Sequence, residues 1–309
     1  MEANKSVVAV FCLWKKKNLM SIVVNMACGL ANRMFQYTYY LYLKSLGYET
    51  SVDFYRTTKL SHENVAWECI FPNAVLPQAS FWKVQWLGGG SDVFCKVRRK
   101  YLPFTHSVLH MPTAFDAILP DKSKGDQYVI GVFQNAKMAD SVKSEVQKAF
   151  TFEPFSEGQN ADLMLEMQGC ESVAIHVRKG NDYASRIWYQ DTCPVKYYED
   201  AVSLMKEKIA NPKFYVFTDN PGWVKENLKG FDYVLVEGNP PAGWGSHFDM
   251  QLMSYCKHNI ISNSTYAWWA AFLNKNVTKT VVCPNIWFNP MSCEDYTSAK
   301  VLCEGWIAL

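Results

Sequence analysis

The chain has 309 residues, of which 49% are hydrophobic and 19% are charged, so it can build the packed core of one large domain or of two. Its formal net charge of +2 at pH 7 is too small to indicate a nucleic-acid-binding protein. The ten cysteines include no CxxC pair and fit neither a zinc site nor a compact disulfide framework. Reduced thiols in a cytoplasmic enzyme are the simplest interpretation.

We expect neither a signal peptide nor a membrane span at the amino terminus. Residues 7–14 are apolar but too few to cross a bilayer, and the lysines at 15–17 follow this run instead of preceding it. We expect residues 1–19 to form an N-terminal extension outside the fold. A second basic cluster at 96–100 is more typical of a solvated face, and an anionic membrane surface is the alternative. The predicted location is cytoplasmic, and the protein could there be bound peripherally to the inner membrane face.

The first half opens in the order of a mononucleotide-binding fold. Residues 21–26 predict a strand, 28–33 a glycine-containing loop, 34–46 a helix and 49–54 a second strand. The dinucleotide fingerprint G-x-G-x-x-G is absent. Gly29 therefore indicates either a plain tight turn or a place where a ligand approaches the backbone closely.

The middle of the chain is rich in proline, glycine and aromatic residues. Residues 55–125 predict short helices and long loops that would form an acceptor wall. Residues 128–134 then predict a strand and 139–150 an amphipathic helix. A shift to turn-forming residues places the domain boundary near 155, giving an N-terminal domain at 20–155 and a C-terminal domain at 156–309.

The second half alternates short apolar strands with helices. This order predicts a parallel, doubly wound α/β domain. The predicted strands are 173–177, 214–218, 233–236, 259–262 and 280–283, and the predicted helices are 194–209, 222–228, 248–257 and 266–274.

Polar residues follow several of these strands, and doubly wound topology gathers strand ends along one crevice. Arg178 offers a guanidinium fork that suits phosphate, although an ion pair with a local carboxylate is the simpler interpretation of this residue alone. Ser264 and Thr265 stand where a helix begins, which indicates either an ordinary cap or an anion site. Together these groups could hold a diphosphate without a metal.

Two carboxylates have open interpretations. Asp249 opens a helix, where it would cap the first turn or accept from two adjacent N–H donors such as guanine presents. Asp219 follows a strand and would be a helix cap or a ribose contact. D-x-D does not occur and the six histidines show no ligand spacing, so no metal site is predicted.

Four stretches resemble a known family. GLANRMFQY (29–37), HVRKGNDY (176–183), FTDN (217–220) and DMQLMSYCKHNIISNSTYAWWAAFLN (249–274) resemble the motifs of the bacterial and animal α-1,2-fucosyltransferases, glycosyltransferase family 11. Their order and spacing agree over most of residues 20–285. The resemblance implies a GT-B fold, in which two Rossmann-like α/β domains face each other across a cleft. It also implies GDP-fucose as the donor substrate, with no metal and no other cofactor.

The resemblance also implies roles for donor-binding residues. Arg178 would contact the β-phosphate, and Ser264 and Thr265 would hold phosphate oxygens. Asp249 and His176 would lie at the guanosine end of the donor.

The remaining implied roles concern the reacting centre. The Gly29–Asn32 loop would reach the pyrophosphate from the other domain, and the acceptor would lie mainly against the first domain. The reaction would be inverting transfer to the 2-hydroxyl of a galactoside such as lactose or a glycan chain, with Asp182 as the first candidate for the base. The sequence departs from the family pattern at Lys179, where a second arginine is usual, and at Asn181, which is an extra residue.

Three other functions stay open. One is fucosyl transfer in another linkage. Another is a nucleotide-cofactor oxidoreductase, which the missing G-x-G-x-x-G counts against. The third is a non-catalytic glycan-binding protein, in which the Arg178 and Ser264 phosphate site would have no purpose.

Overall fold

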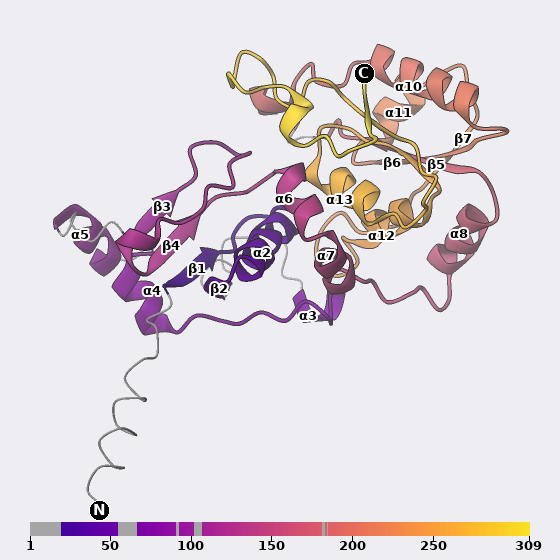
Figure 1. Ribbon diagram of the computed structural model, residues 1–309. Coiled ribbons are helices and arrows are strands. Elements are labelled where there is room, and N and C mark those ends of the chain that lie inside the picture. Colours follow the sequence, from indigo (N-terminus) through magenta and orange to yellow (C-terminus); the bar gives the residue numbers. More distant parts are fainter. Residues whose placement is uncertain (1–19, 55–66, 91–92, 102–106, 181–182, 184) are drawn as a thin grey trace, which may run out of the picture.

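The computed structural model describes residues 20–54, 67–90, 93–101, 107–180, 183 and 185–309. The predicted extension at 1–19 and the predicted base, Asp182, lie outside these residues. Two parallel sheets, one from each half of the chain, form the framework (Figure 1).

The first sheet has the strand order β2-β1-β4-β3, with all neighbours parallel. Its strands are β1 (Ser21–Asn25), β2 (Glu49–Asp53), β3 (Val108–His110) and β4 (Gln127–Ile130). Helix α2 (Leu30–Ser45) connects β1 to β2 and contacts both strands. This order confirms the predicted strand–helix–strand opening of the first half, but α2 begins at Leu30, so residues 30–33 of the predicted loop are helical.

The other helices of the first half are short. They are α3 (Trp67–Ile70), α4 (Phe81–Leu87), α5 (Val93–Tyr101), η3 (Lys122–Lys124), α6 (Ala136–Ser141) and α7 (Lys143–Ala149). The single helix predicted at 139–150 is wrong, because Val142 has φ −126° and ψ 30° and interrupts it. The strand predicted at 128–134 ends at Ile130, and Phe133 takes the left-handed φ of 54°. Strand β3 was not predicted, since three residues carry no readable alternation.

The second sheet has six strands in the order β10-β9-β8-β5-β6-β7, again all parallel. The strands are β5 (Ser172–Val177), β6 (Lys213–Thr218), β7 (Tyr233–Leu235), β8 (His258–Ile260), β9 (Val281–Cys283) and β10 (Ile307–Ala308). The helical segments are α8 (Gln159–Gln168), η4 (Ile187–Tyr189), α10 (Val195–Lys208), α11 (Pro221–Asn227), α12 (Phe248–Tyr255), α13 (Thr265–Leu273) and η5 (Ser298–Lys300). The doubly wound prediction is confirmed, but the two-residue β10 and the helix α8 were not predicted.

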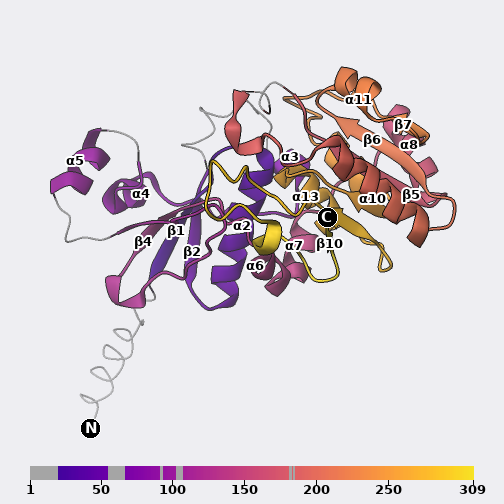
Figure 2. The same ribbon diagram turned by 90° about the horizontal axis from the view of Figure 1, so that it is seen from above.

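Each half is therefore a Rossmann-like α/β unit, and the pair has the GT-B architecture (Figure 2). The domain boundary near residue 155 stays a prediction. The chain passes between α7 and α8 over residues 150–158. None of the helices in the described part of the chain is both long and apolar enough to span a membrane.

Helix α13 joins the two units. Seven of its nine residues are buried, as expected of a helix that is apolar all round. The indole Nε1 of Trp269 donates to the carbonyl of Ala31 in α2 at 2.9 Å, and the ring of Phe35 lies 4.7 Å from that of Trp269. One hydrophobic core consequently includes side chains of both sheets.

We expect Trp269→Ala to lower the free energy of unfolding by about 3–5 kcal/mol, because it opens a cavity at this junction. Since the core is shared, urea unfolding followed by fluorescence and circular dichroism should remain a single transition. Trp82→Ala is the matched control: that indole is 78% exposed, and its loss should change stability by less than about 0.5 kcal/mol. Two separate transitions in the wild-type chain would contradict the shared core.

Candidate functional site

The candidate site lies at the carboxyl edge of the second sheet, where the strand order reverses around β5. Strand β5 pairs with β6 on one side and β8 on the other, which makes this the switch point of the doubly wound fold. Arg178 follows β5, Asp219 follows β6, and Ser264 lies four residues beyond β8. The topology thus brings together strand ends that are up to 86 residues apart in the sequence, as the His176–Ser262 contact demonstrates.

Arg178 stacks on an aromatic ring. Its guanidinium carbon lies 4.3 Å from the centroid of the Tyr189 ring in η4, a cation–π geometry that orients the planar fork. The η4 segment is itself held by Asn289, whose backbone N–H donates to the carbonyl of Trp188 at 2.8 Å. The side-chain amide of Asn289 donates to the carbonyl of Gln190 at 3.1 Å. The ring beneath Arg178 is therefore a supported surface.

The turn after β5 is clamped by the residues that follow β6. Oδ1 of Asp219 accepts from the backbone N–H groups of Lys179 at 2.7 Å and Gly180 at 2.9 Å. A Cβ at position 180 would lie 2.7 Å from Oδ2 of Asp219, which explains why glycine is needed there. The Asn220 amide donates to the carbonyl of Lys179 at 2.9 Å, and its Oδ1 caps α11 by accepting from the N–H of Trp223. The cap is thus Asn220, and Asp219 holds the turn that carries Arg178.

Lys179 stands where the family pattern usually has a second arginine, and the structure gives it another role. Its ammonium donates to the hydroxyl of Tyr183 at 2.8 Å and lies 4.0 Å from the centre of that ring. The ring of Trp223 is 5.1 Å away. These contacts place the Lys179 charge within an aromatic pair that braces the turn.

His176 is held in the neutral form. Its Nδ1 is hydrogen-bonded to the hydroxyl of Ser262 at 2.7 Å, and Ser262 is fully buried. Burial of the imidazole, followed by the nearby charge of Arg178, lowers the pKa of His176 to about 3. His176 therefore offers the site a hydrogen-bonding ring without a charge.

Helix α13 begins without a side-chain cap. Ser264 occupies the N-cap position, but its hydroxyl makes no capping hydrogen bond, so ordinary capping does not explain this residue. Its carbonyl accepts from the N–H of Trp268 at 2.9 Å, which starts the helix. The first turn of a helix carries N–H donors and the positive end of the dipole, which favours an anion at this point. Thr265, the first helical residue, is partly exposed at the same place.

Asp249 lies in the first turn of α12, and His247 occupies the N-cap position. One carboxylate oxygen of Asp249 accepts from the amide of Asn239 at 2.7 Å. Burial raises the pKa of Asp249, and the hydrogen bond from Asn239 offsets only part of that rise. The carboxylate is thus a costly charge in the unliganded fold, which is common for groups that bind a ligand.

Tyr266 ties the two helix starts together. Its hydroxyl accepts from the backbone N–H of Met250 in α12 at 2.8 Å and donates to the carbonyl of Ser246 at 2.8 Å. Tyr266 is the second residue of α13, so its hydrogen bonds connect the predicted phosphate end at the start of α13 with the predicted guanosine end at the start of α12. We call these two connected helix starts the frame of the site.

A cavity of about 450 Å³ reaches the Asp249 end of this frame. Its wall includes Asn239, the partner of Asp249, and Asn160, whose amide donates to Asn239 at 2.8 Å. Residues Cys69 and Ile70 of α3 also line it, so both units contribute to the cavity.

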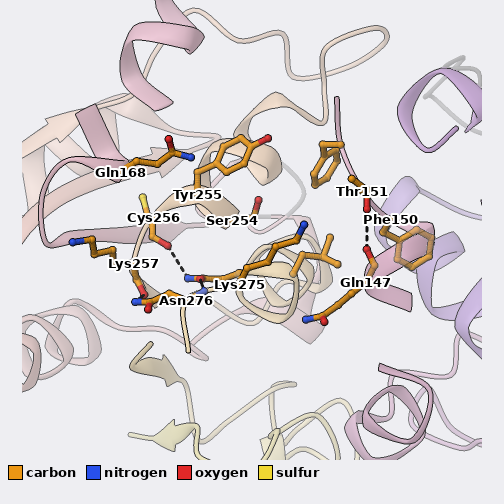
Figure 3. A pocket seen from close by; sticks show the side chains of 13 residues that line it. Gln147, Phe150, Thr151, Gln168, Ser254, Tyr255, Cys256, Lys257, Lys275 and Asn276 are labelled. Atoms are coloured by element: carbon orange, nitrogen blue, oxygen red, sulfur yellow. Dashed lines mark hydrogen bonds between the residues drawn. The ribbon is translucent and has the colours of Figure 1, made fainter. Parts of the chain in front are cut away.

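A second cavity, of about 380 Å³, lies away from the site (Figure 3). It is bounded by Gln147 and Thr151 on one side and by Lys257 and Asn276 on the other. Residues just before β5 and β8 line it, so it opens at the amino edge of the second sheet, opposite the switch point.

The glycine loop of the first half meets the site through a relay of hydrogen bonds. Gly29 is the N-cap of α2 with φ −70°, so its conformation does not demand glycine, and Asn32 lies within the first helical turn. The side-chain Oδ1 of Asn32 accepts from the side-chain amide of Gln134 at 3.3 Å. Oε1 of Gln134 accepts from the indole of Trp287 at 3.1 Å, and the amide of Asn263 donates to the Trp287 carbonyl at 3.2 Å. Asn32 is therefore connected to the segment between β8 and α13.

Several of these contributors were not predicted. Asn239 lies three residues after the predicted strand 233–236. Polar residues that follow strands were used to predict the site, so the same criterion could have found Asn239. Tyr189, Gln134 and Trp287 carry no local signal, because their roles depend on partners more than ten residues away. Among the described residues, no group of three or more His, Cys, Asp or Glu side chains is arranged to hold a metal ion.

The stability effect of Asp249 follows from its raised pKa. A carboxyl group whose pKa is higher in the folded protein than in the unfolded chain costs stability when ionised, and that cost disappears as the pH falls through the raised pKa. We expect Asp249→Asn to raise the melting temperature at pH 7 by about 2–4 °C. The difference from wild type should shrink toward pH 4. A lower melting temperature for the variant at pH 7 would instead assign Asp249 a helix-stabilising role.

Comparisons with known proteins agree with this arrangement. A sequence model described as "Glycosyl transferase family 11" matches residues 113–308. The chain is 28% identical to an alpha-1,2-colitosyltransferase of Escherichia coli over 94% of this chain and 99% of that protein. It is 25% identical to galactoside alpha-(1,2)-fucosyltransferase 2 of Sus scrofa, but there the match spans 43% of this chain and 41% of the relative.

Solved structures match this chain at low sequence identity. Fucosyltransferase NodZ from Bradyrhizobium is 13% identical, with a TM-score of 0.45 over 81% of this chain and 91% of that chain. The family match covers well over half of the sequence and includes the Arg178 turn and the starts of α12 and α13. The chain belongs to glycosyl transferase family 11 and is a glycosyltransferase.

Proposed function

We propose that the protein is an inverting, metal-independent α-1,2-fucosyltransferase that moves L-fucose from GDP-fucose to the 2-hydroxyl of a terminal β-galactoside. One observation carries the proposal: the Arg178 guanidinium, stacked on Tyr189, shares a switch-point edge with the uncapped start of α13. The names of the E. coli and Sus scrofa relatives, a colitosyltransferase and a fucosyltransferase that share the α-1,2 linkage, support the linkage.

The donor would lie along the frame that Tyr266 holds together. Its diphosphate would bind between the fork of Arg178 and the first-turn N–H groups after Ser264, where positive charge is available from both sides. The nucleoside would extend toward Asp249, whose ionised carboxylate suits the two adjacent N–H donors of guanine. Binding would supply the hydrogen bonds that the partly desolvated Asp249 lacks in the free fold.

Transfer would follow from stabilisation of the leaving group. The acceptor hydroxyl oxygen forms a bond to the anomeric carbon while the bond from that carbon to the β-phosphate oxygen breaks. The departing electron pair adds negative charge to the diphosphate, which Arg178 and the α13 start are placed to stabilise. The hydroxyl proton passes to a base, for which Asp182 remains our candidate. Neutral His176 contributes a hydrogen bond rather than a charge.

Metal independence is part of the proposal. The fork of Arg178 and the helix dipole supply the positive charge that a diphosphate requires, so the proposed binding mode calls for no cation. A cytoplasmic location, peripheral to the inner membrane face, is also proposed. Nine of the ten cysteines are in the described part of the chain and all nine are free thiols, which fits a reducing compartment.

A second donor is favoured by one observation. The alpha-1,2-colitosyltransferase matches 94% of this chain and 99% of its own length. The corresponding colitosyl donor is therefore the alternative to GDP-fucose, with the same phosphate contacts expected.

The decisive experiment offers each donor with a panel of β-galactosides, including lactose, in the presence of a chelator. We expect fucose to appear on the galactose 2-hydroxyl by linkage mapping. Transfer only after a divalent cation is restored would refute the metal-independent mechanism. Exclusive use of the colitosyl donor would replace fucose in the proposal.

Arg178 provides a direct test of the leaving-group role. We expect Arg178→Ala to lower kcat by about 10²–10³-fold in a folded protein, because a preorganised donor to the transition state is lost. Arg178→Lys should fall between wild type and Arg178→Ala, since it keeps a charge but loses the fork and the stacking on Tyr189. Lys208→Ala, an exposed site on α10, is the control. An unchanged kcat for Arg178→Ala would sink the assignment.

Asp219 separates a positioning role from donor contact. Asp219→Asn keeps an oxygen that can accept from the Lys179 and Gly180 N–H groups, so we expect transfer within about threefold of wild type. Asp219→Ala releases the turn, and kcat should fall by about 10–100-fold through misplacement of Arg178. Equal loss of GDP affinity in both variants, measured by calorimetry, would show that the carboxylate contacts the donor instead.

A further inference from the structure

The helices α4 and α5 expose an unusual number of large apolar side chains at the end of the first unit that points away from the second (Figures 1 and 2). We call this surface the α4–α5 face. It comprises Phe81, Trp82, Trp86, Val93, Phe94, Val97 and Tyr101. Trp82 is 78% exposed and Trp86 71%, although large exposed aromatic clusters are rare on soluble proteins unless they bind something.

Helix α5 carries its apolar side chains on its outer side. Val93, Val97 and Tyr101 repeat at a spacing of four residues, and Phe94 lies beside them, so the four occupy roughly 100° of the helix circumference. All four are exposed. An ordinary surface helix buries such a stripe against its own core. Here the stripe faces outward.

The opposite side of α5 is fixed against α4. The guanidinium of Arg98 donates to the hydroxyl of Ser107 at 3.0 Å and lies 5.6 Å from the ring of Trp86. The thiol of Cys95 donates to the side-chain oxygen of Gln85 at 2.8 Å. Cys95 and Arg98 are both buried, so the outward direction of the apolar stripe is set by these contacts.

Helix α4 is anchored in the same way. Val84 and Leu87 are buried and pack with Val23 and Tyr128 of the first sheet. The indole of Trp82 therefore belongs to the side of α4 that the core does not use. Both helices thus have one side committed to the fold and one side open.

The charged side chains described on this face are basic, while Asp92 in the connection between α4 and α5 lies outside the described residues. Lys96 and Lys100 border the apolar stripe of α5 and are exposed, and Lys83 lies on α4. None of the described residues of α4, α5 and their connection, 81–90 and 93–101, is acidic. Two copies of the chain meeting through this face would bring like charges together, which disfavours self-association. An anionic surface complements the face instead.

We propose that the α4–α5 face docks the protein on the surface of an anionic bilayer. The aromatic side chains of Trp82, Trp86 and Phe94 enter the boundary between headgroups and acyl chains, while Lys96 and Lys100 meet lipid phosphates. Aromatic and aliphatic residues on one side with lysines along the edge are the features of a helix that lies in a membrane interface. The face is remote from the switch point, so docking leaves the donor site accessible.

The test uses the full chain and vesicles of phosphatidylcholine alone or mixed with phosphatidylglycerol. We expect the wild type to sediment with the mixed vesicles and far less with the neutral ones. Lys96→Glu with Lys100→Glu should weaken binding by at least about 30-fold. Trp82→Ser with Phe94→Ser should weaken it by on the order of tenfold.

Matched controls change the same chemistry elsewhere. Lys208→Glu with Lys275→Glu alters the net charge equally, and Leu165→Ser with Val277→Ser removes exposed apolar side chains from other surfaces. Both control pairs should bind vesicles like the wild type. Because α4 and α5 lie at the end of the first unit that points away from the second (Figure 1), we exclude them from the acceptor wall predicted at 55–125. All variants should therefore keep wild-type transfer to a soluble galactoside, which separates this proposal from the proposed function.

Four results would overturn the proposal. The first is a wild type that ignores the mixed vesicles, and the second is wild-type binding by both α4–α5 variants. The third is a concentration-dependent dimer, seen by light scattering, that the α4–α5 variants dissociate, because that result would assign the face to a second copy. A raised KM for the soluble galactoside in the α4–α5 variants would assign the face to the acceptor.

Discussion

The contact between the indole of Trp269 and the carbonyl of Ala31 is the interaction on which the rest of the arrangement depends. Trp269 lies one helical turn after Thr265, and Ala31 is the second residue of α2. The hydrogen bond and the packing of Phe35 therefore bring the starts of two helices from different sheets together. A buried indole N–H and a buried carbonyl are each costly if left unpaired, so this registration is strongly specified.

The electrostatic character of the site follows from this geometry. A cationic fork on an aromatic ring, an uncapped helix start and a neutral imidazole give the region near Arg178 an electrostatic preference for negative charge. Lys179 is engaged by Tyr183 and Trp223. At the other end, the raised pKa of Asp249 marks a carboxylate whose burial is uncompensated. The Arg178 end thus favours a negatively charged group, and the Asp249 end favours hydrogen-bond donors. A nucleoside diphosphate carries both kinds of group at its two ends.

Much of this framework could be predicted from sequence because it rests on local patterns. Apolar β-branched runs predicted β5 and β6, and the order of strands and helices placed Arg178 and Ser264 at one edge. Long-range partners could not be predicted: nothing near Tyr189 shows that it underlies Arg178. The interruption at Val142 was hidden because its neighbours keep helical periodicity. The role of Asp182 stays a prediction.

The shared core has a consequence for recombining this protein with its relatives. Because α13 belongs to the second half but is packed against α2 of the first, the two halves are not exchangeable modules. A chimera that takes its first half from a relative would place foreign side chains opposite Trp268 and Trp269, and the start of α13 would shift with them. Under the proposed function, donor affinity would then change although no residue of the second half had been replaced. A chimera should therefore take Ala31, Phe35 and α13 from the same parent protein.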